Sequence, residues 1–245
     1  MVEAEKTNLY NLTKDELTKF VADLGEPAYR ANQLWRWMYK KLARDFEGMT
    51  NLPKGFRTTL TERARLGGMA PIAELQSTDG HTQKWLLELP DHERIEAVLM
   101  EYEVRNTACI SVQVGCAYAC AFCATGRMGL IRDLTAGEIV EQIVNIEREL
   151  REAGEPPAPG AAVDEQRLTN IVFMGMGEPL SNYREVMRAV QILNSPEGLN
   201  IGARRMTLST VGLVPTIRRL AQEKIQVNLA VSLHAPTGEL RDTLI

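Results

Sequence analysis

The sequence predicts an α/β protein, a partial (β/α) barrel preceded by a helical region and a small antiparallel β sheet. Three observations predict this class. Apolar residues recur at helical spacing in residues 1–70, alternate as in strands in residues 71–105, and form short runs followed by amphipathic helices in residues 106–245. Repeated strand–helix units give parallel strands. We therefore expect a helical accessory domain, an antiparallel β linker and a partial barrel with these boundaries.

The composition is that of an ordinary globular protein. The chain has 245 residues, of which 44% are hydrophobic and 24% are charged. Its net charge of −4 argues against a generally basic nucleic-acid-binding protein. No apolar stretch is long enough to span a bilayer, and no secretory signal is visible at the start. The 4 cysteines lack an obvious disulfide partner, so we expect a cytoplasmic protein without a membrane partner.

The N-terminal region contains three expected helices. Thr13 and Glu16 form a capping box that begins the first helix, and Gly25 ends it. The second helix is expected over Tyr29–Lys41, and the third follows Pro53. These assignments give the accessory domain its helical character.

Positive charge is concentrated in this helical region. Residues 28–66 contain nine Lys or Arg and three Asp or Glu, a balance of +6. Aromatic side chains such as Trp35 and Tyr39 lie among these charges. A basic face with stacking rings suits RNA. The alternatives are a solvated helical face for the charges and core packing for Trp35, which shares a helical stripe with Ala31 and Met38.

Three strands are expected in the linker. Ile72–Ser77 and Gln83–Leu89 flank Asp79-Gly80, a pair of residues typical of a hairpin turn. Arg94–Glu103 alternates as the third strand. The pattern predicts a small antiparallel sheet between the helical region and the partial barrel.

The partial barrel contains four short apolar runs, typical of parallel strands buried on both faces. These runs are Ala108–Val114, Asn170–Met174, Met206–Thr210 and Val227–Leu233. Helices are expected after the first three, beginning at Thr135 with Glu138 as its capping-box partner, near Asn182, and with Pro215 in the first turn. The segment Ala153–Gln166 is rich in Pro, Ala and Gly, and predicts an exposed loop without a chemical role.

Three cysteines follow the first of these strands with the spacing C-x-x-x-C-x-x-C. They are Cys116, Cys120 and Cys123, with the aromatic Phe122 before the last. Three thiolates hold three irons of a [4Fe–4S] cluster and leave the fourth iron without a protein ligand, whereas most clusters have four cysteine ligands. An open iron can bind a cofactor and pass it an electron. The spacing therefore predicts a redox cluster with a vacant coordination position.

Two other readings of these cysteines stay open. A zinc site needs a closed tetrahedral set, usually built from two separate ligand pairs. Here the fourth ligand would be Cys109, His81, His92 or His234, none of which belongs to a second C-x-x-C pair. The remaining possibility is a chance group of buried thiols.

Polar segments follow all four expected strands, where sites of parallel folds lie. The cysteine loop follows the first strand, Gly175–Pro179 the second, Ser209 ends the third, and Ser232–His234 end the fourth. Glycines allow a backbone to approach a ligand closely. Each serine and His234 is more often structural when considered alone. Together, the four strand ends favour one cofactor site.

The sequence resembles the radical SAM enzymes of the RlmN/Cfr family in four segments: V-G-C-A-Y-A-C-A-F-C-A-T-G, F-M-G-M-G-E-P-L, L-S-T-V-G and V-S-L-H-A-P. The stretch P-A-Y-R-A-N-Q-L-W-R-W-M-Y is similar to the accessory domain of the same family. The resemblance extends from about residue 8 to the last residue. It implies a radical SAM type of partial barrel with an RNA-recognition accessory domain.

The resemblance also implies an activity. RlmN-like enzymes methylate C2 of adenine in 23S rRNA and in tRNA, next to the anticodon. One S-adenosylmethionine (SAM) methylates a protein cysteine, and a second is cleaved at the cluster to a radical that activates this methyl group. A transient disulfide then resolves the protein–RNA adduct. Implied partners are 23S rRNA, tRNA and an electron donor such as flavodoxin.

Three alternatives to this activity remain. The first is Cfr-like methylation at C8 of adenine. The second is another radical SAM enzyme that acts on a small molecule. The third is a non-catalytic iron–sulfur or zinc RNA-binding protein.

The family's functional residues have counterparts in this sequence. By resemblance, the cluster ligands are Cys116, Cys120 and Cys123, and the SAM-binding residues are Gly177, Glu178, Ser209, Ser232, Leu233 and His234. Cys109 matches the resolving cysteine and Glu96 the proton acceptor. From the strand pattern alone, Cys109 is a buried thiol and Glu96 a solvent-facing residue.

The resemblance implies further strands, another SAM-contacting asparagine and a methyl-carrying cysteine after Ile245. No cysteine follows Cys123 in the sequence. We therefore expect a C-terminally truncated barrel that binds the cluster and much of SAM but cannot complete methyl transfer. An uncovered sheet edge is also an aggregation hazard.

Overall fold

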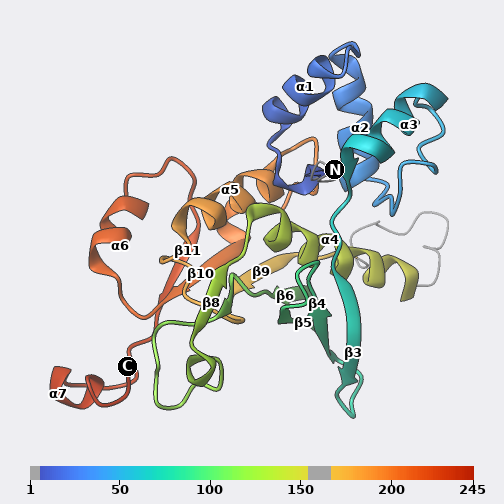
Figure 1. Ribbon diagram of the computed structural model, residues 1–245. Helices are drawn as coiled ribbons and strands as arrows, with labels where there is room; N and C mark the ends of the chain where they lie inside the picture. Colours follow the sequence, from blue (N-terminus) through green and yellow to red (C-terminus); the bar gives the residue numbers. More distant parts are fainter. Residues whose placement is uncertain (1–5, 154–166) are drawn as a thin grey trace.

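The computed structural model describes residues 6–153 and 167–245 (Figure 1). A group of helices near the N-terminus lies against one end of a twisted sheet, and helices α4 (Ala136–Ala153) and α5 (Tyr183–Asn194) lie along the sheet (Figure 1). The expected loop at Ala153–Gln166 falls, after its first residue, outside the described residues. Within the described ranges, none of the helices combines the length and apolar character that a membrane span requires.

Residues 7–65 form what we call the helical head. Its elements are β1 (Thr7–Asn8), η1 (Leu9–Asn11), α1 (Lys14–Asp23), α2 (Tyr29–Tyr39), α3 (Lys54–Arg63) and β2 (Ala64–Arg65). The predicted capping box begins α1, since the Thr13 amide donates to Glu16 Oε2 at 2.8 Å. Gly25 follows the helix with a φ of +79°, which glycine adopts without strain. The three predicted helices of this region are thus confirmed.

The head has an aromatic core that continues into the rest of the molecule. Trp35 is buried, and its ring lies 4.5 Å from that of Tyr39. Arg148 of α4 (Ala136–Ala153) donates to the carbonyls of Leu42 and Ala43 at 2.9 and 2.8 Å. Core packing of Trp35 is therefore confirmed, and the head is bonded directly to the main helix of the sheet.

One seven-stranded sheet has the order β11-β10-β9-β6-β5-β4-β3. Its strands are β3 (Ala70–Gln76), β4 (Thr82–Glu88), β5 (Arg94–Tyr102), β6 (Arg105–Cys109), β9 (Asn170–Phe173), β10 (Met206–Thr210) and β11 (Asn228–Val231). The strands β6, β9, β10 and β11 are parallel, and β3, β4 and β5 are antiparallel neighbours. The predicted hairpin strands therefore extend the parallel sheet. Domain boundaries at residues 70 and 105 stay a prediction.

The predicted strand Ala108–Val114 is wrong as one element. The structure has β6 up to Cys109 and a separate β7 (Gln113–Gly115), which pairs antiparallel with β8 (Leu130–Asp133). Between them the chain leaves the ladder, because the Val112 amide donates to the Met176 carbonyl at 2.8 Å. This change of partner directs the cysteine loop out of the sheet.

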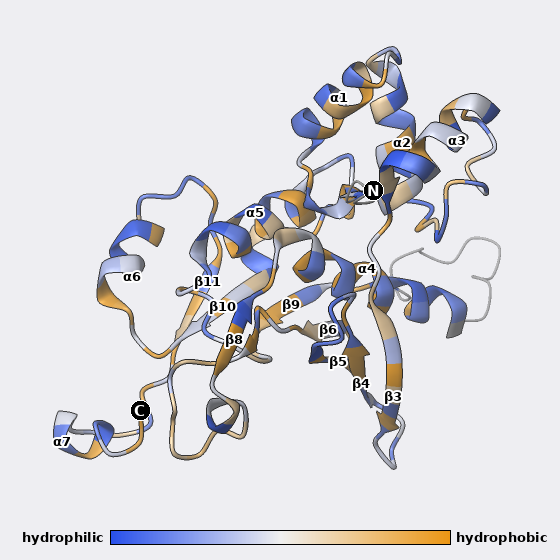
Figure 2. Ribbon diagram, viewed as in Figure 1, coloured by the Kyte–Doolittle hydropathy of each residue, from blue (hydrophilic) through white to orange (hydrophobic). Residues whose placement is uncertain are grey.

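The parallel strands are covered on one face only among the described residues. On β9 and β10, Ile171, Phe173 and Leu208 are fully buried, whereas their neighbours Val172 and Ser209 are half-buried. Side chains alternate between the two faces of a strand, so helices α4 and α5 (Tyr183–Asn194) cover the first face. Most of β9 is hydrophobic (Figure 2). The expectation of burial on both faces is therefore wrong for this part of the chain.

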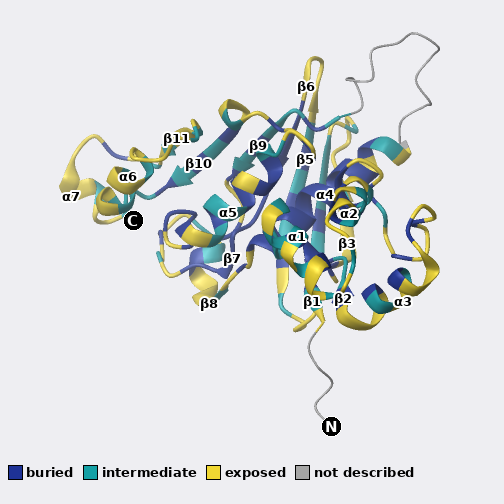
Figure 3. Cartoon of the chain, turned by 90° about the horizontal axis from the view of Figure 1, so that it is seen from above, coloured by how far each residue is buried: buried dark blue, intermediate teal, exposed yellow. Residues whose placement is uncertain are grey.

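The remaining elements are short. They are η2 (Thr125–Met128), η3 (Ala203–Arg205), α6 (Val214–Leu220) and α7 (Gly238–Arg241). The last two helices contain no buried residue, and they lie at one side of the molecule (Figure 3). Pro215 is in the first turn of α6 and Thr135 caps α4 together with Glu138, both as predicted.

Candidate active site

One pocket of about 390 Å³ lies at the carboxyl ends of the parallel strands. All nine residues predicted for the cluster and for SAM line it: Cys116, Cys120, Cys123, Gly177, Glu178, Ser209, Ser232, Leu233 and His234. They come from the cysteine loop, from the loop after β9, and from the ends of β10 and β11. The pocket thus brings together residues up to 118 positions apart in the sequence, Cys116 and His234.

The β7–β8 hairpin fixes the start of the cysteine loop. The Cys116 amide donates to the Gly129 carbonyl at 3.0 Å. Gly115 has a φ of +73°, and a Cβ atom there would lie 1.8 Å from the same carbonyl oxygen. Only glycine fits this close backbone approach. The hairpin therefore fixes the backbone position of Cys116, the first cysteine of the loop.

The donor set fits an iron–sulfur cluster better than a single metal ion. Among the described residues, no three His, Cys, Asp or Glu side chains converge to hold one ion. A cubane does not require such convergence, since each of three thiolates binds a different iron. Burial raises the pKa of the Cys116 and Cys120 thiols. Ligation needs thiolates, so cluster binding at neutral pH would release protons.

Nothing in the described part of the chain completes a zinc tetrahedron around these thiols. Of the three histidines, His234 alone lines the pocket, where its ring lies 4.5 Å from that of Phe122. His92 has a positive φ of 67° and an exposed side chain beside Glu88. The zinc alternative is therefore not favoured.

Glu178 is a buried carboxylate between two strand ends. Its side chain accepts from the Leu180 amide at 2.9 Å and from the Val211 amide at 2.8 Å. The residue is 3% exposed, so two backbone donors replace water around the charge. Glu178 thus ties the loop after β9 to the end of β10.

Gln113 is bonded to the loop after β9. The sequence pattern did not identify it as a site residue. Its side-chain oxygen accepts from the Glu178 amide at 2.8 Å, and its nitrogen donates to Asp133 at 2.7 Å. Gly177 has a φ of +99°, and a Cβ atom there would lie 2.5 Å from the Gln113 Cβ. The only signal in the sequence is a polar residue inside the apolar run I-S-V-Q-V.

A second buried polar residue supports the same region. Ser111 Oγ donates to the Glu96 carbonyl at 2.6 Å and accepts from the Met176 amide at 2.9 Å. Gln142 of α4 bonds both backbone groups of Ser111 at 2.9 Å. These bonds give hydrogen-bond partners to backbone groups of Ser111 and Met176, at the point where the chain after β6 leaves the sheet. Ser111 and Gln142 were also missed from sequence, because contacts across 31 positions leave no local pattern.

The predicted SAM-binding serines differ in their contacts. Ser209 Oγ donates to the Phe173 carbonyl at 2.6 Å, which is the structural role considered from sequence. The Ser232 amide donates to the Thr210 carbonyl at 2.8 Å and continues the β10–β11 pairing to the rim of the pocket. His234 has a positive φ of 52°. The chain therefore turns sharply at the end of this wall.

Glu96 and Cys109 are outside the lining of this pocket. Glu96 is 46% exposed and pairs with Lys84 at 3.0 Å. Cys109 lies opposite Val98 in the β5–β6 register, so it shares a sheet face with Glu96. Burial raises the pKa of the Cys109 thiol, although a backbone hydrogen bond from Met174 acts in the other direction. All four cysteines are free thiols.

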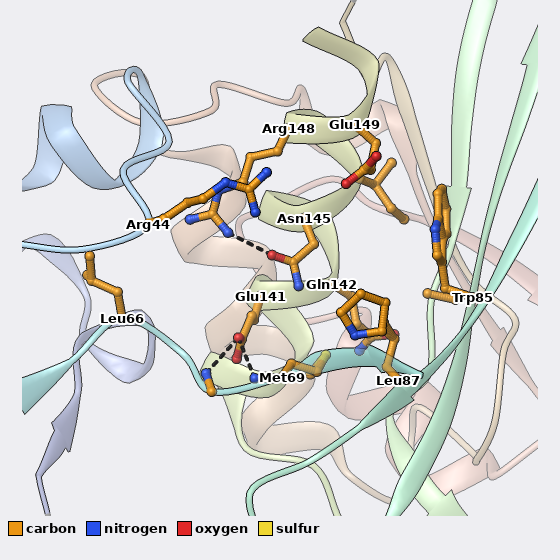
Figure 4. A pocket seen from close by; sticks show the side chains of 14 residues that line it. Arg44, Leu66, Met69, Trp85, Leu87, Glu141, Gln142, Asn145, Arg148 and Glu149 are labelled. Carbon is orange, nitrogen blue, oxygen red and sulfur yellow. Dashed lines mark hydrogen bonds between the residues drawn. The ribbon is translucent and has the colours of Figure 1, made fainter. Parts of the chain in front are cut away.

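A separate pocket of about 250 Å³ lies between the head, the sheet and α4 (Figure 4). Glu141 accepts there from the amides of Gly68 and Met69 at 2.7 and 2.8 Å. Arg148 donates to Asn145 at 2.7 Å (Figure 4). Its two most buried charges thus have protein partners, and none of the predicted site residues lines it. This pocket belongs to the joint that holds the head.

Comparisons with known proteins give one consistent result. The family model described as "Ribosomal RNA large subunit methyltransferase N-terminal domain" matches residues 7–66. The chain is 47% identical over 97% of its length to a probable dual-specificity RNA methyltransferase RlmN of Dictyoglomus thermophilum. It is 46% identical over 97% of its length to a protein of the same description from Roseiflexus castenholzii.

The chain covers 65% and 66% of the lengths of these two relatives, which is just under two thirds. A solved structure is also similar, described as a radical SAM methyltransferase from Sphaerobacter thermophilus. It has a TM-score of 0.91 and 52% sequence identity, over 98% of this chain and 67% of that one. The chain belongs to the radical SAM methyltransferases, and it is similar over nearly all of its length to proteins described as RlmN.

Proposed function

We propose that this chain carries the cluster-binding and SAM-binding parts of an enzyme that methylates C2 of adenine in 23S rRNA and in tRNA. One observation supports the proposal most. Nine residues from four separate segments line a single pocket at the carboxyl ends of parallel strands. The relatives named RlmN are 47% and 46% identical to this chain over 97% of its length.

Cys116, Cys120 and Cys123 would hold three irons of a [4Fe–4S] cluster. The bound cluster would supply the electron that splits SAM into methionine and a 5′-deoxyadenosyl radical. The chain's own task is to bind and orient. The loop at Gly177 and the ends of β10 and β11 bring backbone polar groups to the pocket, and exposed Phe122 and His234 form an aromatic side of it.

Glu96 and Cys109 would act on the RNA base. Both belong to the sheet face that no helix covers among the described residues, so a base approaching this face meets both side chains. Glu96 would take a proton from the adenine carbon after the adduct forms. Cys109 would keep its proton at neutral pH, because burial raises its pKa. Its sulfur would then attack the sulfur of the methyl-carrying cysteine, so that the S–S bond forms as the S–C bond to the transferred carbon breaks, and the thiol proton would end on that carbon to complete the methyl group.

The sequence contains 4 cysteines, and the proposal already assigns all of them. A fifth cysteine would have to carry the methyl group. We therefore propose that the polypeptide of residues 1–245 cleaves SAM but does not methylate RNA by itself. An external reductant such as flavodoxin would deliver the electron.

The proposed RNA surface is the basic face of the helical head. Arg36, Lys40 and Lys41 are exposed at the end of α2, and Lys54 is exposed at the start of α3. Charges of one sign on one face attract a phosphate backbone, and that attraction weakens with salt. This surface would bind 23S rRNA and tRNA.

Anaerobic reconstitution with iron and sulfide tests the proposal. We expect nearly four irons per chain, and 5′-deoxyadenosine after reduction with SAM, measured by liquid chromatography. Cys120→Ala should lose both, whereas Cys109→Ala, the matched thiol control, should keep both. Absence of a SAM-cleaving cluster in the wild-type chain would overturn the proposal. With a polypeptide that also carries a methyl-carrying cysteine, mass spectrometry against standards would separate 2-methyladenosine from the 8-methyl isomer.

A further inference from the structure

Residues 237–245, which we call the closing segment, are bonded both to the cysteine loop and to the residues that follow β10 and β11. The segment contains the short helix α7, capped by Thr237, whose Oγ1 accepts from the Leu240 amide at 3.4 Å. The Ala121 amide, between the second and third cluster cysteines, donates to the Leu244 carbonyl at 2.9 Å. One end of the closing segment is therefore bonded to the cysteine loop.

The other contact of this segment is made by Arg241. Its Nη2 donates to the carbonyl of Val211 and, at 3.2 Å, to the carbonyl of Ser232. These two residues follow β10 and β11, and both line the pocket. Val211 also donates its amide to the carboxylate of Glu178 at 2.8 Å. A chain of contacts thus runs from Arg241 through the strand end to Glu178.

The rim of the pocket needs such a link. The strand β11 pairs only with β10 among the described residues, and its side chains are largely exposed. Little packing therefore fixes where the end of β11 lies. Arginine presents several N–H donors in a rigid plane, and a charged donor makes a stronger bond to a carbonyl than a neutral one.

We propose that Arg241 is a positioning residue that holds the ends of β10 and β11 together and fixes them against the cysteine loop, so that the SAM side of the pocket keeps its shape. This inference rests on the proposed function of the pocket. Arg241 acts through Val211 and Ser232. Arg241 is not one of the proposed iron ligands, which are the three thiols of the cysteine loop.

Two substitutions and one control test the inference on the reconstituted chain. Arg241→Met removes the donors, and Arg241→Lys keeps the charge but loses the planar group. Arg218→Met removes an exposed arginine of α6 and is the control. The readouts are iron per chain, SAM affinity by equilibrium dialysis, and the change that SAM causes in the electron paramagnetic resonance spectrum of the reduced cluster.

We expect Arg241→Met to keep the iron content and to bind SAM about tenfold or more weakly, with a smaller spectral change. Arg241→Lys should fall between it and the wild type, and Arg218→Met should stay within about twofold of the wild type. A merely structural arginine would shift the unfolding temperature without this ordered series. Circular dichroism melting checks that each variant is folded.

SAM affinity of a folded Arg241→Met variant within about twofold of the wild type would overturn the inference. Equal weakening in Arg218→Met would overturn it as well, because general surface charge would then explain the effect. Loss of iron in a folded Arg241→Met variant would also contradict it. If Arg241→Met does not fold, Arg241→Lys decides, and affinity equal to the wild type overturns the inference. Failure of the wild type to bind SAM refutes the proposed function instead.

Discussion

At the scale of single residues, the candidate site depends on glycines and buried polar groups that hold backbone in unusual positions. Gly177 allows the loop after β9 to pass against Gln113, and Gly115 allows β7 to meet the turn before β8. Both have positive φ, which side chains disfavour. The loop geometry therefore depends on the absence of a Cβ atom at these two positions.

Gly177→Ala is expected to destabilise the chain by about 2–4 kcal/mol, because a methyl group would combine backbone strain with overlap against Gln113. Gly202→Ala is the matched control. Gly202 has a φ of −59°, and a Cβ atom there would meet nothing within 4 Å. Urea unfolding of the three proteins measures both effects. Equal free energies of unfolding for Gly177→Ala and the wild type would show that the loop relaxes freely.

Cys109 gives a prediction about pH. Burial raises its pKa, so at any pH near neutrality it has less thiolate than an exposed cysteine. In a variant whose other three cysteines are alanine, iodoacetamide should react slowly at pH 7. The rate should rise about tenfold per pH unit and level off only above the ordinary range for thiols. A plateau near pH 8 would contradict the expected direction.

At the scale of elements, α4 connects the head with the sheet. It begins at a capping box under the pocket and carries Gln142, which bonds the backbone of Ser111. Further along, Arg148 reaches the loop after α2. One helix thus supports both the exit of the cysteine loop and the attachment of the basic head, so its position affects the proposed cofactor site and the proposed RNA surface together.

Arg148→Met is expected to lower the free energy of unfolding by about 2–4 kcal/mol, because the carbonyls of Leu42 and Ala43 lose a charged donor. Arg184→Met on α5 is the control, since its side chain is 89% exposed and pairs with the adjacent Glu185. Denaturant titration followed by tryptophan fluorescence measures the difference. A change below about 0.5 kcal/mol would show that water replaces Arg148 at no cost.

At the scale of the whole molecule, the described sheet ends at β11 on one side, with Leu229 and Val231 exposed. Exposed large apolar residues also surround the pocket, Phe122 and Leu233 among them. An uncovered strand edge pairs readily with other chains. The 245-residue polypeptide should therefore self-associate more readily than its net charge suggests.

Leu229→Lys is expected to reduce that association, since a charge on an edge strand opposes pairing between sheets. Leu229 is absent from the pocket lining, so the substitution should leave iron binding unchanged. Light scattering over a range of protein concentrations measures the effect. Unaltered association in a folded Leu229→Lys variant would place the contact elsewhere.

Much of the architecture could be predicted from local patterns. Capping residues located the starts of α1 and α4, and the Asp79-Gly80 turn located the β3–β4 hairpin. The break between β6 and β7 was not predicted, because the run after Cys109 stays apolar while its hydrogen-bond partners change. Local periodicity records which face a residue presents and carries no information about which strand it pairs with.

The available chemistry could be read from the order of amino acids alone: three thiols spaced for a cluster with an open iron, and polar residues after each parallel strand. Tertiary structure decided which of these groups meet. It brought nine of them to one pocket, left Glu96 and Cys109 on the open sheet face, and recruited Gln113, Ser111 and Arg241 as supports. The bonds of Gln113 to Glu178, of Ser111 to Met176 and of Arg241 to Val211 join residues at least 30 positions apart, so they exist only once the strands have paired.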